Sequence, residues 1–541
     1  MRPGHKNDRA SANFLWGLLV LGKSMRSLGL AALAVLALIS LTGLRLESQG
    51  VFYDELHQAP AAFRYIGSHP FMFTWPHRGI PLLNMTYVGA IKSNVYGLYL
   101  RYVNPHFTIA TWRFLGIAFV AIGLFVFVVV AGRLLPLDAA ILFLFLFLSD
   151  ISVIVMTRHD WGPTALAQTL RLLFLSLWLL TALDRPSAFK LGLAGFLVGI
   201  SIWEKLSSVV LLAPLCILLF MASGRSKKDW LAAAIGLFAG TLPLLVANMT
   251  TYMSDQGFIS IGLTDSPPRY SDSLTIQRLA KHAYGFVSLG QGRLVRELVL
   301  GEKSDNFIER AEVALIGLLM IAACLAARRA GRFHRFAPLV IAMVGTYILT
   351  AAGLAALPSR THIHHWIIGT PFQYAAIALT LSVLDRRSAL YKWVLAASVL
   401  VIVMRVPTII NVERSFFSGK SSARFDPAFN RLFQLAATRS ADSAFIATDW
   451  GSATQIYCGT NGNDGSVYEL YENKNPDQAV IDIAAKTKKQ FLYLVTTGMA
   501  KSGASSAILT AMESAPGWSS VTVESEFASL GPVRIRKFVK Y

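Results

Sequence analysis

The stretch TIATWRFLGIAFVAIGLFVFVVVAG, residues 108–132, decides the fold class of this 541-residue chain. Arg113 is the only charged residue in the stretch, and most of the others are apolar. A helix rises about 1.5 Å per residue, so a run of this length crosses a hydrocarbon core about 30 Å thick. We therefore expect a transmembrane helix here.

Comparable apolar runs recur along most of the chain. Hydrophobic residues make up 54% of the sequence and charged residues only 15%, which together with these runs indicates a polytopic α-helical membrane protein. We predict about eleven transmembrane helices, near residues 28–44, 108–132, 137–156, 163–182, 189–204, 206–222, 229–248, 311–328, 335–357, 366–384 and 390–410.

Basic residues orient these helices. The formal net charge is +19, and many basic residues, such as Arg133, Lys227 and Arg386, lie in connections between apolar runs. Such residues stay on the cytoplasmic side, which indicates an internal N-terminus and, with an odd number of helices, an external tail. We expect a multi-pass protein of the inner (plasma) membrane, surrounded by membrane lipids and without a nucleic acid partner.

The chain divides into a cytoplasmic segment at 1–27, a transmembrane domain at 28–410 with external loops at 45–107 and 249–310, and an extracytoplasmic domain at 411–541. The last part is richer in Ser, Asp, Asn and Gly. It contains the strand-like segments 444–448 and 491–495, with helical stretches between them. We therefore expect a small α/β domain at the C-terminus.

Two adjacent acids, Asp54 and Glu55, lie just beyond the first apolar run, in VFYDELH at residues 51–57. The predicted topology brings Asp160 to the same external face. Carboxylates at a membrane face can accept a proton from a hydroxyl group or hold a cation. They can equally be solvated loop charges or partners for an arginine such as Arg158.

Lys205 follows Trp203-Glu204 at an external helix junction. A lysine there can bind the phosphate of a lipid, because its compact charge suits a headgroup at the bilayer edge. The alternative is that Lys205 extends toward the interface or pairs with Glu204.

Three histidines, His362, His364 and His365, precede the tenth predicted helix. Histidine is a common metal ligand, so the cluster is a candidate metal site. A histidine cluster at a membrane edge is more often an interfacial feature, and both interpretations stay open.

Further patches occur in a fixed order after the paired acids: Pro81-Leu82-Leu83, Trp112-Arg113-Phe114-Leu115, Gly132-Arg133-Leu134-Leu135, Asp160, Gly195 to Gly199 leading to Glu204-Lys205, and His365-Trp366 to Pro371. Together they resemble the polyprenol-phosphate-dependent, integral-membrane glycosyltransferases of the C superfamily, over roughly residues 28–385. The resemblance is in particular to the branch that contains protein O-mannosyltransferases and lipid A aminoarabinose transferases. The chain departs from the family's pattern where His159 replaces a common proline and Glu204 a threonine.

The resemblance implies transfer of a sugar from a polyprenyl-phosphate donor to an external acceptor, which could be a glycan, a lipid or a protein. Asp54 would be the general base of an inverting displacement, with Glu55 and Asp160 orienting the acceptor. The implied ligands of the donor phosphate are Lys205, Arg158, Arg78 and Arg360. A divalent metal cation, which not all members of the family require, would be held by Glu55, His57 and His362.

A transporter or flippase of lipid-linked glycans is the alternative function. Transporters tend to place charged residues near the bilayer midplane on interrupted helices. The notable charges of this sequence are predicted to cluster at one membrane edge, which favours an enzyme. A non-catalytic scaffold that uses the tail as an assembly surface is a third option.

Overall fold

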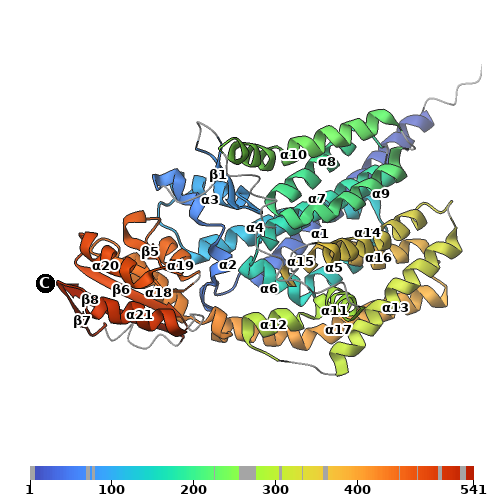
Figure 1. Ribbon diagram of the computed structural model, residues 1–541. Coiled ribbons are helices and arrows are strands. Elements are labelled where there is room, and N and C mark those ends of the chain that lie inside the picture. The colour runs from blue at the N-terminus through green and yellow to red at the C-terminus, as the bar shows by residue number, and fades with distance from the viewer. Residues whose placement is uncertain are drawn as a thin grey trace, which may run out of the picture.

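A bundle of long helices carries a small α/β domain at one end (Figure 1). The computed structural model describes residues 7–541 except for 69–72, 76–78, 185, 224–225, 255–275, 304–306, 332, 358–362, 450, 472, 498–501 and 524–531. The bundle contains α1 (Asn7–Thr42), α4 (Ile109–Leu134), α5 (Leu137–Leu148), α6 (Ile151–His159), α7 (Thr164–Leu183), α8 (Ala188–Glu204), η2 (Leu206–Leu211), α9 (Leu212–Ser223), α10 (Lys227–Met253), α13 (Phe307–Ala330), α14 (Ala337–Ala356), α15 (Ile363–Trp366), η5 (Ile367–Gly369), α16 (Thr370–Val383) and α17 (Ala389–Ser418).

All eleven predicted apolar runs fall on helices, but fewer of them are long enough to span a membrane. Within the described residues, eight helices are long and apolar enough to cross a membrane. The number is nine if the bent pair α5 and α6 forms one span. The two runs that fall short are α8, with 17 residues, and the run Leu206–Ala222, which begins as a 3-10 helix. A helix of 17 residues is about 26 Å long, which is less than the hydrocarbon thickness.

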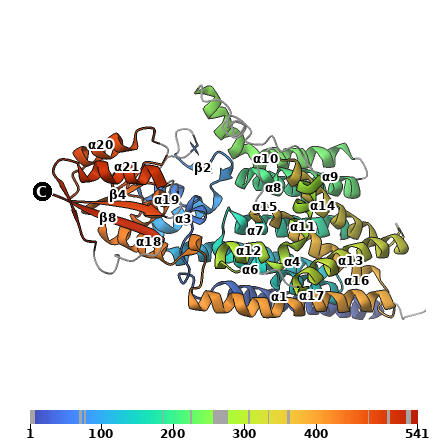
Figure 2. The same ribbon diagram turned by 60° about the horizontal axis from the view of Figure 1, so that its bottom comes forward.

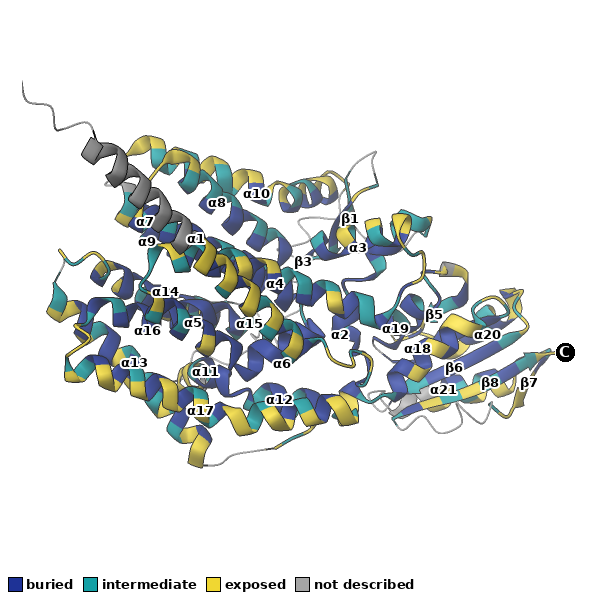
Figure 3. Cartoon of the chain, turned by 180° about the vertical axis from the view of Figure 1, so that it is seen from behind, coloured by how far each residue is buried: buried dark blue, intermediate teal, exposed yellow. Residues whose placement is uncertain are grey.

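The outer surface of the bundle is apolar. Large hydrophobic side chains such as Leu36 on α1, Phe238 on α10 and Val403 on α17 are exposed, and Figure 3 shows exposed residues along these helices. Exposed apolar surface on this scale is expected for helices that face lipid. The most buried spans are α7 and Ile363–Val383, which form the centre of the bundle.

Glycines bring α8 and α10 into close contact. A Cβ atom at Gly195 would lie 2.1 Å from the Ala233 carbonyl oxygen, and one at Gly236 would lie 1.9 Å from that of Gly192. Small residues spaced along two helices allow this approach, which is typical of helix pairs in membranes. The pair fixes the position of the C-terminal end of α8, where Lys205 follows.

The segments between the first and second spans lie at the same end of the bundle as the C-terminal domain (Figure 2). They comprise α2 (Tyr53–Leu56), η1 (Pro60–Ile66), β1 (Phe73–Thr74), β2 (Pro81–Met85), β3 (Val88–Gly89) and α3 (Ile91–Tyr102). Later in the chain, α11 (Ile276–Val287), η4 (Ser288–Gln291) and α12 (Arg293–Leu300) follow α10.

The C-terminal domain is a mixed sheet with helices on both faces. Its elements are η6 (Ala423–Phe425), α18 (Ala428–Arg439), β4 (Ser443–Ala447), α19 (Ser452–Gly459), η7 (Asp464–Ser466), β5 (Val467–Glu469), α20 (Pro476–Lys486), β6 (Phe491–Thr497), α21 (Ser502–Glu513), β7 (Trp518–Val521) and β8 (Val533–Lys540). The strand order is β5-β4-β6-β8-β7, with β4 parallel to both β5 and β6. The two strands predicted at 444–448 and 491–495 are β4 and β6.

This domain packs on the segment that carries the paired acids. The Gln455 side chain donates to the Val51 carbonyl oxygen over 2.6 Å, and the Val51 amide donates to Asn430 over 2.8 Å. Gly451 has φ +92, and a Cβ atom there would lie 2.4 Å from the Tyr53 ring. The carboxyl end of β4 therefore holds the chain next to Asp54.

Two helices extend beyond their predicted bounds. Helix α1 runs without a break through residue 27, and α17 extends to Ser418, beyond the predicted end of the bundle at 410. In the predicted external loop at 45–107, the strands β2 and β3 precede α3. Burial of Leu82 and Leu83 against the bundle explains why this part is extended.

The close contact of α8 with α10 gives a first prediction. Gly236→Ala should lower the unfolding free energy by about 1–3 kcal/mol, because the added methyl group meets backbone atoms. Gly317→Ala on α13 is the matched control, since nothing lies within 4 Å of its Cβ position, and alanine there should be neutral or stabilising. Apparent melting temperatures in detergent measure both effects. Equal melting temperatures for the two variants would contradict the packing described here.

Candidate functional site

Asp54 is the accessible acid of the site. Its side chain keeps 29% of its surface exposed, and its Oδ2 atom accepts a hydrogen bond of 3.0 Å from the Trp161 indole. Burial raises the pKa of Asp54, although the Trp161 hydrogen bond and the positive charges of Arg424 and Lys205 oppose the rise. A carboxylate with a raised pKa accepts protons more readily than one in water. Asp54 therefore combines access with basicity.

Glu55 faces the opposite way and is fully buried. Its two oxygen atoms accept hydrogen bonds from Arg113, one from Nε over 2.8 Å and one from Nη2 over 2.9 Å. Burial alone would raise the Glu55 pKa, but Arg113 and His159 outweigh it and lower the pKa to about 2. With both oxygens engaged, Glu55 fixes α2 to α4. The predicted roles of Glu55, acceptor orientation and metal binding, are not supported by this placement.

Asp160 is also buried and engaged. Its Oδ2 atom pairs with the Lys92 ammonium group over 2.5 Å, and its Oδ1 atom accepts from the Ala165 amide over 2.7 Å. Lys92 also lies over the Trp112 ring, 4.0 Å from its centroid. Asp160 thus connects α3 to the first turn of α7, and its role in orienting the acceptor stays a prediction.

Lys205 occupies the extended connection between α8 and η2. It is buried, it forms an isolated antiparallel bridge with Val88, and its ammonium group donates to the Gly162 carbonyl oxygen over 2.5 Å. Burial and the neighbouring charge of Arg171 lower the Lys205 pKa to about 7. The group is therefore poised to gain or lose a proton near neutral pH.

Glu204 does not form the ion pair with Lys205 that the sequence left open. Among the described residues, no carboxylate oxygen of Glu204 lies within 4.0 Å of the Lys205 ammonium group. Instead, its Oε2 atom accepts a hydrogen bond of 3.3 Å from the Ile91 amide at the start of α3. Glu204 therefore holds α3 against α8, as an acid at a helix N-terminus does.

A single turn links the carboxylate of Asp54 to the ammonium group of Lys205. Trp161 bonds to Asp54, and the carbonyl of the next residue, Gly162, bonds to Lys205. Gly162 has φ +67, and a Cβ atom there would lie 2.8 Å from the His364 ring, which also contacts Trp161. The turn therefore has a base on one side and a cation on the other.

Arg158 has a structural role, contrary to the prediction that it binds the donor phosphate. Its guanidinium group is buried and donates to the Thr42, Leu44 and Arg45 carbonyl oxygens over 2.5–3.1 Å. These carbonyls belong to the end of α1 and the residues after it, where the helix leaves acceptors unsatisfied. Arg158 caps α1 and has little capacity left for a phosphate.

The remaining predicted residues are only partly described. Arg78, Arg360 and His362 lie outside the described residues. The His57 Nδ1 atom is 3.9 Å from the Asp54 Oδ1 atom, and burial lowers the His57 pKa to about 4, so this imidazole is neutral at pH 7. No group of three His, Cys, Asp or Glu side chains in the described part of the chain has metal-site geometry. Metal binding stays a prediction.

Lys92 is a site residue that the sequence did not reveal. It is 68 residues from its partner Asp160, and no motif marks it. The only signal in the sequence is a single positive charge close to the start of α3.

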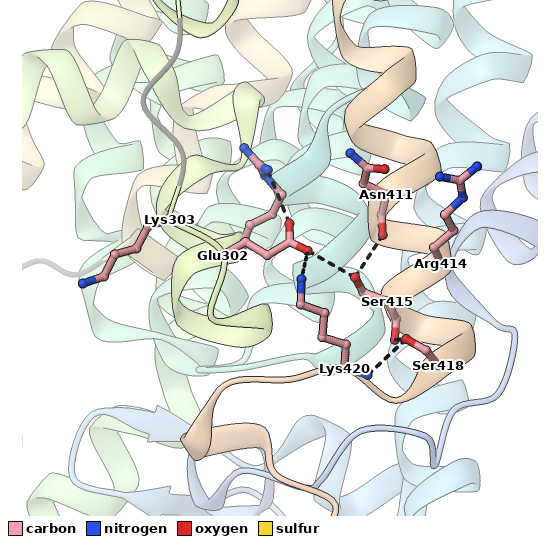
Figure 4. A pocket seen from close by; sticks show the side chains of 8 residues that line it. Glu302, Lys303, Asn411, Arg414, Ser415, Ser418 and Lys420 are labelled. Atoms are coloured by element: carbon pink, nitrogen blue, oxygen red, sulfur yellow. Dashed lines mark hydrogen bonds and ion pairs between the residues drawn. The ribbon is translucent and has the colours of Figure 1, made fainter.

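A separate polar cleft of about 590 Å³ lies at the end of α17 and contains none of the predicted site residues. Figure 4 shows Glu302 near its centre, within reach of Lys420 at 3.0 Å and of the Ser415 hydroxyl at 3.3 Å. Arg296 also pairs with Glu302, over 3.5 Å. The cleft is thus an ion-pair network that joins the segment after α12 to α17.

Two crystal structures share this fold. ArnT from Cupriavidus metallidurans bound to undecaprenyl phosphate matches with a TM-score of 0.60 and 10% sequence identity, over 94% of this chain and 98% of ArnT. Its apo state matches with a TM-score of 0.56 and 12% identity, over 94% of this chain and 97% of ArnT. No family model and no curated protein matches the sequence. These matches show the fold, so the predicted fold class, a polytopic α-helical membrane protein with a C-terminal α/β domain, is confirmed.

The contrast between the two adjacent acids gives a second prediction. Glu55→Gln should lower the unfolding free energy by about 3–5 kcal/mol, because it leaves the buried Arg113 without a counter-charge. Asp54→Asn should leave stability unchanged or raise it, because burial already disfavours the charged carboxylate. Thermal unfolding of the two purified variants in detergent measures the difference. The assignment fails if Asp54→Asn is the more destabilised of the two.

Proposed function

We propose that the protein is a membrane glycosyltransferase that moves a sugar from a polyprenyl-phosphate donor to a hydroxyl group of an acceptor. The observation that carries the proposal is the Trp161-Gly162 turn, which bonds to Asp54 on one side and to Lys205 on the other. An inverting displacement needs a base near the attacking hydroxyl group and a cation near the departing phosphate, on opposite sides of the reacting carbon. The fold shared with ArnT, one of whose structures contains undecaprenyl phosphate, supports a lipid-phosphate donor.

Asp54 is proposed as the general base. The acceptor oxygen attacks the anomeric carbon while the bond from that carbon to the phosphate oxygen breaks. The hydroxyl proton moves to the Asp54 carboxylate, and the bonding electrons move to the phosphate. The raised pKa of Asp54 favours this step, since a more basic carboxylate accepts the proton more readily. Attack on the face opposite the leaving group inverts the anomeric centre.

Lys205 is proposed to stabilise the departing phosphate. Negative charge develops on the phosphate as the bond breaks, so a fixed cation there favours the transition state. A nearby phosphate also raises the pKa of Lys205 from about 7, which keeps the ammonium group protonated during the reaction. Glu55 and Asp160 act indirectly, because they hold α2 and the Trp161 turn in place.

The site is proposed to face the outside of the plasma membrane. Lys227 and Lys228 begin α10, and Arg328 and Arg329 end α13, at connections that the sequence predicts to be internal. Basic connections stay in the cytoplasm, so the end that carries Asp54 and the C-terminal domain would be external. The acceptor would then be an external glycan, lipid or protein.

A transporter of lipid-linked glycans is the second candidate, and the bundle contains an observation that favours it. Asp150 lies at the break between α5 and α6, which bend by 60°. Arg405, in the middle of α17, pairs with Glu312 over 2.6 Å. Charged residues therefore also occur within the bundle, in addition to those predicted to cluster at one membrane edge. However, Asp150 accepts from the Tyr374 hydroxyl over 2.6 Å, so these groups satisfy one another.

Asp54→Asn tests the function directly. In a strain that lacks the protein, the wild-type chain should restore a sugar on surface glycans, lipids or proteins, and Asp54→Asn should not, because it lacks the base. Mass spectrometry of the envelope measures the product, and equal amounts of both proteins in the membrane exclude a folding defect. Asp477→Asn, an exposed acid in the C-terminal domain, is the control and should behave as wild type. A lipid-linked glycan that moves across the membrane with no new glycosidic bond would instead support the transporter.

The pH dependence gives a third prediction. Transfer should fall as the pH drops through the raised pKa of Asp54, because only the carboxylate accepts the proton. Trp161→Phe removes a hydrogen bond that stabilises this carboxylate, so the acid limb should move to higher pH by about one unit. The initial rate of transfer to a membrane acceptor fraction gives the profile. Trp393→Phe, on the outside of α17, should not move it, and an unmoved limb in Trp161→Phe would exclude Asp54 as the base.

A further inference from the structure

Arg171 is a buried cation with few partners. It lies within α7, its side chain is fully buried, and its one hydrogen bond in the described structure runs from Nη2 to the Ser208 hydroxyl over 3.2 Å. Its Nε and Nη1 atoms have no hydrogen-bond partner among the described residues. A charge buried in this way costs several kcal/mol unless something neutralises it.

The other buried arginines show how unusual this is. Arg113 pairs with Glu55, Arg296 with Glu309, and Arg405 with Glu312, at 2.6–2.8 Å. Arg158 donates to several backbone carbonyls. In the part of the chain that the structure describes, only Arg171 among these buried guanidinium groups lacks both a carboxylate and a carbonyl partner. The counter-charge of Arg171 is therefore missing from the described chain.

The geometry places Arg171 beside Lys205. Lys205 directly precedes η2, and the Ser208 amide in the first turn of η2 donates to the Lys205 carbonyl oxygen over 2.8 Å. Because Arg171 bonds to the Ser208 hydroxyl, its guanidinium group lies next to the residue whose amide bonds to the Lys205 carbonyl oxygen. The charge of Arg171 is also the main electrostatic influence on Lys205. Two buried cations are thus connected through Ser208, one by a side-chain bond and one by a backbone bond.

We propose that Arg171 and Lys205 form a two-cation site that binds a lipid phosphate more tightly as the dianionic leaving group than as the monoanionic donor. This inference rests on the proposed function for the identity of the lipid, whereas the cation pair itself is independent of it. Arg171 would contact the phosphate directly and would be a further catalytic residue.

The charge balance explains the preference. In the donor, the phosphate is a diester and carries one negative charge. When the bond from the anomeric carbon breaks, its electron pair goes to the phosphate oxygen, and the product is a monoester with up to two negative charges. Two cations match the second state better than the first. An interaction that strengthens along the reaction lowers the barrier, whereas one that is equal in both states does not.

The melting temperature without lipid distinguishes a phosphate-binding arginine from a structural one, because loss of a structural arginine would lower it. Arg171→Gln removes an uncompensated buried charge, so the lipid-free variant should melt at the same temperature as wild type or higher. Undecaprenyl phosphate should raise the melting temperature of the wild type, because it binds the folded state, and should raise that of Arg171→Gln much less. Arg171→Lys keeps the charge and should retain part of the shift. A variant that is less stable without lipid and still fully stabilised by it would overturn the proposal.

Equilibrium binding tests the charge preference. The full-length protein in detergent is titrated with undecaprenyl phosphate, a monoester, and with undecaprenyl methyl phosphate, a diester that carries one charge. The wild type should prefer the monoester by about tenfold or more, and Arg171→Gln should lose that preference. Arg414→Gln removes an exposed cation at the end of α17 and should bind both lipids as the wild type does. An equal preference in wild type and Arg171→Gln would refute the site.

Three further outcomes separate the possible explanations. If inorganic phosphate alone stabilises the wild type as well as undecaprenyl phosphate does, the site takes free phosphate and the lipid assignment is wrong. If binding depends on Arg171 but no sugar is ever transferred, the proposed function fails while the two-cation site stands. If sugar is transferred and Arg171→Gln binds both lipids as the wild type does, the inference alone fails.

Discussion

The ion pair between Asp160 and Lys92 holds the turn on which the candidate site is built. Asp160 ends α6 in a left-handed conformation, with φ 44, and its other oxygen caps the first turn of α7. The path from α6 to α7 is therefore set by one buried carboxylate. Trp161 and Gly162 lie on that path, so the bonds to the Asp54 carboxylate and to the Lys205 ammonium group depend on it. Separating a buried pair leaves both charges uncompensated, which makes the arrangement rigid.

In apolar surroundings, a buried charge of the bundle is stable only when it has a counter-charge or a hydrogen-bond partner. Glu55 and Glu312 each meet an arginine, and Asp150 meets a tyrosine hydroxyl. These groups are satisfied within the chain, so they explain the packing of the helices and leave little for a ligand. The groups that indicate a ligand site are those with free surface or without a counter-charge among the described residues. Asp54 retains solvent exposure, and Arg171 lacks a counter-charge among the described residues. Asp54 bonds to the Trp161 turn, and Arg171 bonds to Ser208, three residues after Lys205.

The sequence predicted what depends on local pattern. Apolar runs mark every helix of the bundle, and alternation marks β4 and β6, because helix and strand periodicities are properties of neighbouring residues. Charge pairing depends on residues far apart in the chain, so neither the ion pair of Lys92 nor the bonds of Arg158 to the end of α1 were predicted. Arg171 stands inside the apolar run at 163–182, where the sequence shows a charge but not its surroundings. The close contact of α8 with α10 also escaped prediction, because it depends on glycines of two separate helices.

The different fates of Asp54 and Glu55 follow from helix geometry. Successive residues of a helix point about 100° apart, so two adjacent acids on α2 cannot share one environment. The side chain that faces α4 meets Arg113 in a water-free interior and becomes a strongly acidic, permanently charged anchor. For the side chain that faces the Trp161 turn, burial raises the proton affinity, and the single indole hydrogen bond only partly opposes the rise. A buried ion pair beside an accessible carboxylate thus gives one short helix both an anchor and a base, and the anchor fixes the direction in which the base points.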